Sequence, residues 1–131
     1  MTRLLLVALG GALGSMARYG VGLGAARLFP ASAWPWGTLT VNVIGGLAMG
    51  LLVGWMGLKA GASQDTVRAF AAVGVLGGFT TFSAFSLETA LMIERRDYGL
   101  ASAYILLSLV LAVTALMAGL WLARRAFGAA L

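Results

Sequence analysis

Residues 98–123 form one of the two longest uncharged stretches of the chain and read YGLASAYILLSLVLAVTALMAGLWLA. A helix needs roughly 20 apolar residues to cross the hydrocarbon of a bilayer, because it rises only about 1.5 Å per residue. A second uncharged stretch, Trp36–Leu58, is also long enough to cross. These two stretches predict membrane-spanning helices at 36–58 and 98–123.

Two further stretches reach the same length if each tolerates one ion. We predict helices at about 4–26, interrupted by Arg18, and at about 69–93, interrupted by Glu88. The connections are short, so neighbouring helices are expected to pack antiparallel. The expected connections are Leu28–Pro35, the polar loop Lys59–Arg68 and the charged turn Glu94–Asp97.

The composition supports the same conclusion. The chain has 131 residues, of which 61% are hydrophobic and only 10% are charged, against roughly a quarter charged in an ordinary soluble domain. There is too little polar surface to cover so apolar a core, so the surplus must face lipid. We expect an all-α integral membrane protein, a single membrane domain over 1–131 with the lipid bilayer of the cell (inner or plasma) membrane around it.

Absent residue types exclude several functions. The chain has neither cysteine nor histidine, which removes thiol nucleophiles, zinc clusters and imidazole bases, so we do not expect an enzyme. The net charge is +5, but basic residues habitually flank membrane helices. We therefore expect no nucleic-acid partner.

The basic residues outside the membrane divide almost evenly between the two ends of a four-helix array. Because an excess of Lys and Arg on one side sets the orientation of a membrane protein, this near-balance favours neither orientation strongly. Insertion in both orientations would allow an antiparallel homodimer of dual topology; a fixed orientation with the N-terminus inside is the competing interpretation. Four helices cannot easily enclose a polar pathway, so a transporter of solute would need at least two copies. On the side of the termini lie Arg3, Lys59, Arg68, Arg124 and Arg125, and opposite them lie Arg27, Arg95 and Arg96.

Glycines recur at intervals of four residues along the predicted helices. Such spacing aligns small residues on one face and lets helix backbones approach closely in lipid. Packing within one copy and packing between two copies fit this pattern equally well. The glycines in question are Gly10 and Gly14, Gly20 and Gly24, Gly46 with Gly50 and Gly54, and Gly74 and Gly78.

The third predicted helix contains residues 74–88, which read GVLGGFTTFSAFSLE. Glycines followed by β-branched threonines weaken a helix, and the hydroxyls of Thr80, Thr81 and Ser83 can satisfy the backbone groups thereby released. We predict that this helix is broken near its middle. Freed backbone groups survive at membrane depth only inside protein or beside a polar cavity, where they can serve as ion ligands; a mere packing kink is the alternative.

Aromatic and amide side chains lie close to this stretch in the predicted helices. Phe82 and Phe85 share one helix face and are either core aromatics or rings whose weakly positive edges contact a small anion. Asn42, with Thr38 four residues before it, must face another helix or water. Its amide either donates to an anion or forms a hydrogen bond between helices.

Hydroxyls and ions provide further candidates. Tyr104 and Ser108 lie four residues apart and place two hydroxyls on one stripe of the fourth helix. Arg18 and Glu88 are the only ions well inside predicted spans, which makes both functional candidates. Either they pair with each other, or Arg18 marks a vestibule that gathers anions and Glu88 tunes the pathway.

With these residues in view, the chain resembles the Fluc fluoride channels, also called CrcB-like proteins, over essentially its whole length. Three motifs in the same order carry the resemblance. They are Gly10-Gly11-Ala12-Leu13-Gly14 with Ala17-Arg18-Tyr19, Gly37-Thr38-Leu39 with Val41-Asn42 and Gly45-Gly46, and Gly77-Gly78-Phe79-Thr80-Thr81-Phe82-Ser83-Ala84-Phe85.

The resemblance implies a passive, fluoride-selective channel that relieves cytoplasmic fluoride toxicity, built as a dual-topology antiparallel homodimer with two pores. It implies that the rings of Phe82 and Phe85 contact fluoride and that Asn42 donates to it. It also implies a structural sodium ion at the dimer centre, held by the carbonyls of Gly77 and Thr80 from both copies. The full expected fluoride pathway is Thr38, Asn42, Thr81, Phe82, Ser83, Phe85, Tyr104 and Ser108, with Arg18 at a vestibule and Glu88 tuning it.

Two positions depart from the family pattern. Ala84 stands where threonine is common, and Ala112 stands where the hydroxyl stripe would have its next member.

Two other functions compete with the channel. A small dual-topology drug/proton exchanger would need a central acid in its first helix, where this chain has Arg18. A purely structural membrane subunit would conduct nothing.

Overall fold

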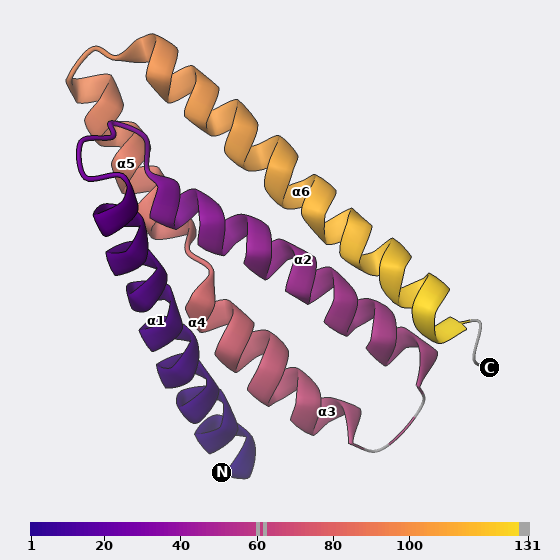
Figure 1. The fold of residues 1–131 in the computed structure, drawn as a ribbon. Helices are drawn as coiled ribbons and strands as arrows, with labels where there is room; N and C mark the ends of the chain where they lie inside the picture. The colour runs from indigo at the N-terminus through magenta and orange to yellow at the C-terminus, as the bar shows by residue number, and fades with distance from the viewer. Residues whose placement is uncertain (60, 62, 129–131) are drawn as a thin grey trace.

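The computed structural model describes residues 1–59, 61 and 63–128, and every element within these residues is helical. Four helical spans are long and apolar enough to cross a membrane, as the sequence predicts. They are α1 (Thr2–Leu28), α2 (Trp36–Leu58), a composite third span (Gln64–Glu94) and α6 (Tyr98–Gly128). Figure 1 shows them as long, tilted rods joined by short connections.

The third span is composite. It consists of α3 (Gln64–Val67), the π-helical segment η1 (Arg68–Leu76), α4 (Gly77–Phe79) and α5 (Phe82–Glu94). The expected loop Lys59–Arg68 is therefore shorter than predicted, because α3 already begins at Gln64; residues 60 and 62 of that loop lie outside the described part of the chain.

The outer spans are longer than their uncharged stretches. Helix α1 begins before Arg3, and α6 continues through Arg124 and Arg125 to Gly128. An uncharged stretch measures only the part of a helix that lies in hydrocarbon, and long basic side chains let the helix continue into the headgroup region.

Two pairs of elements carry most of the packing. Helices α2 and α6 run side by side, and α1 lies along η1 and α4 (Figure 1). Glycines line both contacts: a Cβ atom at Gly119 would lie 2.8 Å from the Leu51 amide nitrogen, and one at Gly10 would lie 2.9 Å from the Val75 amide nitrogen. Backbones approach this closely only where side chains are missing.

The glycine pattern therefore divides between two uses. Most of the regularly spaced glycines pack within the chain: Gly10, Gly14, Gly74 and Gly78 at the contact of α1 with the third span, and Gly46, Gly50 and Gly54 at the contact of α2 with α6. By contrast, a Cβ atom at Gly20 or Gly24 would meet nothing within 4 Å. This part of α1 is open to a second surface.

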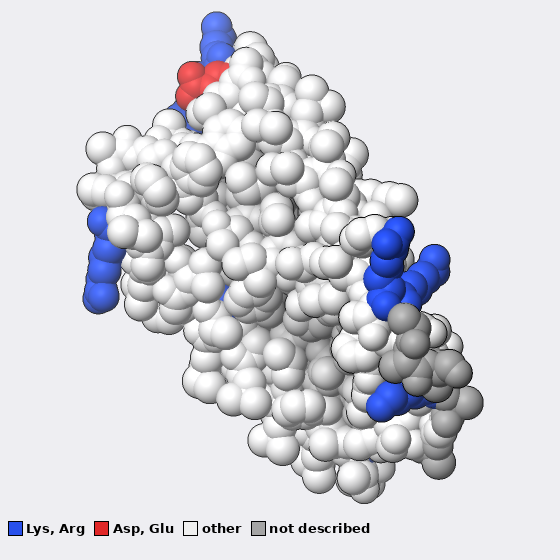
Figure 2. Space-filling model, turned by 45° about the vertical axis from the view of Figure 1, so that its right-hand side comes forward, with Lys and Arg blue, Asp and Glu red and all other residues white. Residues whose placement is uncertain are grey.

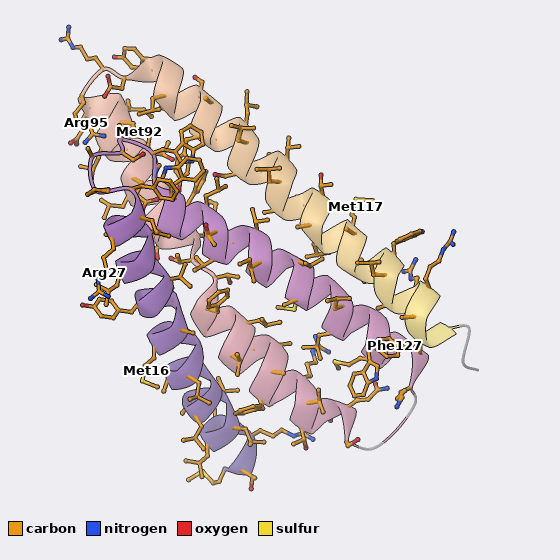
Figure 3. All side chains as sticks on the ribbon, viewed as in Figure 1. Met16, Arg27, Met92, Arg95, Met117 and Phe127 are labelled. Atoms are coloured by element: carbon orange, nitrogen blue, oxygen red, sulfur yellow. The ribbon has the colours of Figure 1, made fainter. Side chains whose placement is uncertain are left out.

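The buried core is small and lies toward the α1–α2 connection. Its packed cluster consists of Leu39, Met92, Ala101 and Tyr104, with Phe85 among the partly buried residues packed on it, and Val41 and Ala123 are buried elsewhere. Figure 3 shows the contrast among the methionines: Met92 lies between helices, whereas Met16 and Met117 extend outward. This core fixes Tyr104 and Phe85, which belong to the candidate site.

Candidate functional site

Thr80 and Thr81 separate α4 from α5 with extended backbone, at φ/ψ of −79°/159° and −153°/116°. Their hydroxyls satisfy neighbouring groups. Thr81 caps α5, because its Oγ1 accepts a hydrogen bond from the Ala84 amide at 3.1 Å, and it also lies 3.2 Å from the Ser83 hydroxyl. The Thr80 hydroxyl donates to the Leu76 carbonyl at 2.9 Å. A threonine N-cap of this kind starts a new helix at Phe82.

Asn42 of α2 holds the backbone of Thr81 from both sides. Its Nδ2 donates to the Thr81 carbonyl at 3.0 Å, and its Oδ1 accepts from the Thr81 amide at 2.8 Å. The sequence leaves two roles open for Asn42, donation to an anion or a hydrogen bond between helices. The structure contains the second, a pair of hydrogen bonds from α2 to the third span. A carboxamide nitrogen carries two hydrogens, so one N–H remains beyond the bond to Thr81.

The extended segment also changes the partners of two carbonyls. In an uninterrupted α-helix the Thr81 amide would donate to Gly77 and the Ala84 amide to Thr80, but these amides donate instead to Asn42 and to the Thr81 hydroxyl. The carbonyls of Gly77 and Thr80 are thus released from the helical ladder. Carbonyl oxygens suit hard cations, and the described residues contain no group of three His, Cys, Asp or Glu side chains that could hold one.

Arg18 does not pair with Glu88, so that alternative is wrong. Its Nη1 donates to the Thr80 carbonyl at 3.1 Å. This carbonyl stands at the end of α4, where free carbonyls give a helix terminus partial negative charge. The partner of Arg18 is thus a backbone group that the interruption of the span makes available.

Glu88 accepts two short hydrogen bonds. The Thr38 hydroxyl donates to Oε1 at 2.6 Å, and the Tyr104 hydroxyl donates to Oε2 at 2.6 Å. The tyrosine is fully buried. Hydrogen bonds to a carboxylate are stronger than neutral ones, so these three side chains tie α2, α5 and α6 together.

A first cavity, of about 360 Å³, opens beside the interrupted span. Its wall is mostly apolar and includes Thr80, Leu109, Ala112 and Val113 besides residues of the expected pathway. Phe82 and Phe85 lie with ring centroids 5.6 Å apart, and 78% of Phe82 is exposed. The pathway residues that it brings together are Asn42, Thr81, Phe82, Phe85 and Ser108.

A second cavity, of about 350 Å³, lies under the connection between α1 and α2 and is lined by Thr38 and Glu88. Tyr104 links the two cavities. Its ring lies 5.2 Å from that of Phe85, which lines the first cavity, while its hydroxyl contacts Glu88, which lines the second.

Sequence reasoning missed Trp34, whose ring meets that of Tyr104 edge-on at 5.6 Å. The residue lies in a connection, where no periodic pattern marks a buried position. Among the described side chains, the Trp34 Nε1 and the Ser108 hydroxyl are buried without a hydrogen-bond partner.

Of the two residues that depart from the family pattern, Ala112 lines the first cavity. The geometry gives no role to the other, Ala84.

Comparisons with known proteins identify the family of the chain. The family model described as CrcB-like protein, Camphor Resistance (CrcB), matches residues 5–120. The chain is 61% identical over 127 residues to a fluoride-specific ion channel FluC of Caulobacter sp. (strain K31), covering 97% of this chain and 98% of the relative. It is 56% identical to one of Hyphomonas neptunium, covering 97% and 99%. The resemblance of the motifs is confirmed, and the chain belongs to the CrcB-like protein family.

Proposed function

We propose that this chain forms a fluoride-selective passive channel of the inner membrane, which releases fluoride from the cytoplasm down its electrochemical gradient and so lowers fluoride toxicity. The observation that carries the proposal is the meeting of Asn42, Phe82 and Phe85 around one cavity at the interrupted span. The names of the relatives supply the identity of the ion.

In the first cavity, fluoride exchanges hydration water for a few weak, uncharged partners. The edges of the two phenyl rings attract the anion through the ring quadrupole. The second N–H of Asn42 and the unpartnered hydroxyl of Ser108 provide hydrogen-bond donors. Because none of the described residues that line this cavity is cationic, fluoride can bind and still leave, as conduction requires.

Fluoride passes between the first and second cavities beside the contact of the Tyr104 hydroxyl with Glu88. Both hydroxyls in this cluster, of Thr38 and Tyr104, donate to the carboxylate. They can serve fluoride only when they turn away from Glu88. The carboxylate thus competes with the anion for these donors, and this competition is how Glu88 tunes the pathway.

Two copies in opposite orientations complete the channel. Phe82 is exposed and the glycine face at Gly20 and Gly24 is open, and both features favour a second copy packed against them.

The chain has no cysteine, so Gly99→Cys, in the open first turn of α6, gives a single site for labelling. Membrane-impermeant maleimide should label about half of the chains in sealed cells; complete labelling or none would exclude dual topology.

The carbonyls of Gly77 and Thr80, from both copies, would hold a structural sodium ion at the dimer centre. Each copy contributes these two released carbonyls, so two copies together would provide four. The Thr80 carbonyl accepts from Arg18, but a carbonyl oxygen has a second lone pair. When bound, the ion would supply a positive charge that stabilises carbonyl groups left without a helical partner. Replacing sodium with N-methylglucamine should lower the melting temperature of the purified dimer. An unchanged melting temperature would show that the dimer does not depend on a sodium ion.

Release of fluoride and of chloride from proteoliposomes, followed by ion-selective electrodes, separates the candidate functions. The channel predicts fluoride release without chloride release. Uptake of organic cations driven by a pH gradient would favour the drug/proton exchanger, and sealed vesicles would favour a structural subunit.

A further inference from the structure

The ends of α2 and α6 on the side of the chain termini each carry a cation stacked on an indole ring. The Lys59 Nζ lies 5.4 Å from the ring centroid of Trp55. The Arg125 Cζ lies 4.7 Å from the ring centroid of Trp121. We call these four residues the basic–aromatic end.

The two helix ends are neighbours. A Cβ atom at Gly54 of α2 would lie 2.6 Å from that of Ala123 of α6, and one at Gly128 would lie 4.0 Å from Leu58 Cδ1. Figure 2 shows several Lys and Arg side chains gathered on one side of the molecule. Both stacked pairs therefore belong to one region of the surface.

The charge of this end is unbalanced. Of the five basic residues on the side of the termini, Arg3 is paired with Asp65 at 2.9 Å, and Asp65 is the one acid there. The opposite side has three basic residues and two acids, Glu94 and Asp97, and Arg95 lies 3.7 Å from Asp97. Unneutralised positive charge is therefore concentrated where α2 and α6 end.

This combination suits the phosphodiester of a lipid headgroup. Indole rings settle at the level of the headgroups, and guanidinium groups bind phosphate oxygens through two parallel hydrogen bonds. A cation held on a ring loses less freedom when it binds a phosphate than one on a free side chain. Anionic lipids also attract juxtamembrane basic residues through their surface potential.

We propose that the basic–aromatic end binds the phosphate of an anionic phospholipid in the leaflet that adjoins the ends of α2 and α6. The inference stands whichever ion the chain conducts, because none of the four residues lines either cavity described above. In an antiparallel pair, each leaflet would contain one such site.

Titration of the purified protein with phosphatidylglycerol and with phosphatidylcholine of the same acyl chains, followed by native mass spectrometry, tests the proposal. The wild type should bind phosphatidylglycerol more tightly. Lys59→Gln with Arg125→Gln should weaken that binding roughly 10-fold. Trp55→Leu with Trp121→Leu keeps both charges and should weaken it about 3-fold through lost preorganisation.

Arg27→Gln with Arg96→Gln removes the same charge from the opposite end and should change binding less than about 2-fold. If this control weakened the binding of phosphatidylglycerol as much as Lys59→Gln with Arg125→Gln, the lipid would be held by diffuse electrostatic attraction and not by a site, and the proposal would be wrong. Equal binding of the two lipids by the wild type would also overturn the proposal, and that comparison needs no variant to fold. Displacement of the lipid by inorganic phosphate would mean that the site takes free phosphate instead.

Discussion

The two halves of the third span are held in different ways. Before the extended residues, the span meets α1 through backbone: a Cβ atom at Gly78 would lie 2.6 Å from the Gly11 carbonyl oxygen, and one at Gly74 would lie 2.9 Å from the Gly10 Cα. After them, α5 is held by hydrogen bonds of Glu88 and leaves Phe82 largely exposed. The first half is a rigid support, and the second presents the side chains that can meet an ion.

The largest expected effect on stability comes from breaking the glycine contact. At Gly14 a Cβ atom would lie 2.8 Å from the Phe79 amide nitrogen and 3.0 Å from the Val75 carbonyl carbon, and backbone atoms cannot move aside cheaply. Gly14→Ala should therefore cost about 1–3 kcal/mol or more of unfolding free energy, measured as the thermal stability of the purified protein in detergent.

Gly11→Ala is the matched control on the same helix, because its Cβ atom would meet nothing within 4 Å. Its stability should stay within about 0.5 kcal/mol of the wild type. Equal losses in the two variants would contradict the view that backbone contact fixes the first half of the span.

The next largest effect concerns the bond between Asn42 and the interrupted span. Asn42→Ala leaves the Thr81 amide and carbonyl without their partner, which should cost about 1–3 kcal/mol and abolish fluoride flux. Thr114→Val changes an exposed polar residue of α6 and should alter neither quantity. Normal flux in Asn42→Ala would exclude its carboxamide from the pathway.

A smaller effect is expected at Glu88, where two hydroxyl donors share one carboxylate. Glu88→Gln keeps the shape but loses the charge, which should cost about 1–2 kcal/mol. Tyr104→Phe removes only one of the two bonds and should cost less. Because the bond is shared, the double variant should lose less stability than the sum of the two single variants; strict additivity in thermal unfolding would argue against the contact.

The positions of the spans were predictable because hydrocarbon thickness sets the length of an uncharged stretch. Contacts between distant residues were not. Spacing along the chain gave no reason to place Arg18 at the Thr80 carbonyl rather than at Glu88, because 62 positions separate Arg18 from Thr80. Likewise, the sequence left two roles open for Asn42, because its partner Thr81 lies 39 positions away.

The helix ends and the loop show a second limit. Charge-free stretches underestimate α1 and α6, whose ends include basic residues. The loop before the third span was too long in the prediction because Gln64–Val67 is polar but helical. Polarity marks the boundary of the hydrocarbon, not the end of a helix.

Phe82 distinguishes the two halves of the third span most directly, because 78% of its surface is exposed in one copy. Phe82→Ile removes little packing within one copy, so it should cost less stability than Gly14→Ala, while it removes the ring edge that attracts fluoride. The decisive measurement is fluoride efflux from proteoliposomes of the wild type and of Phe82→Ile at equal protein content. The account predicts rapid efflux for the wild type and none for the variant, whereas normal efflux from the variant would contradict it.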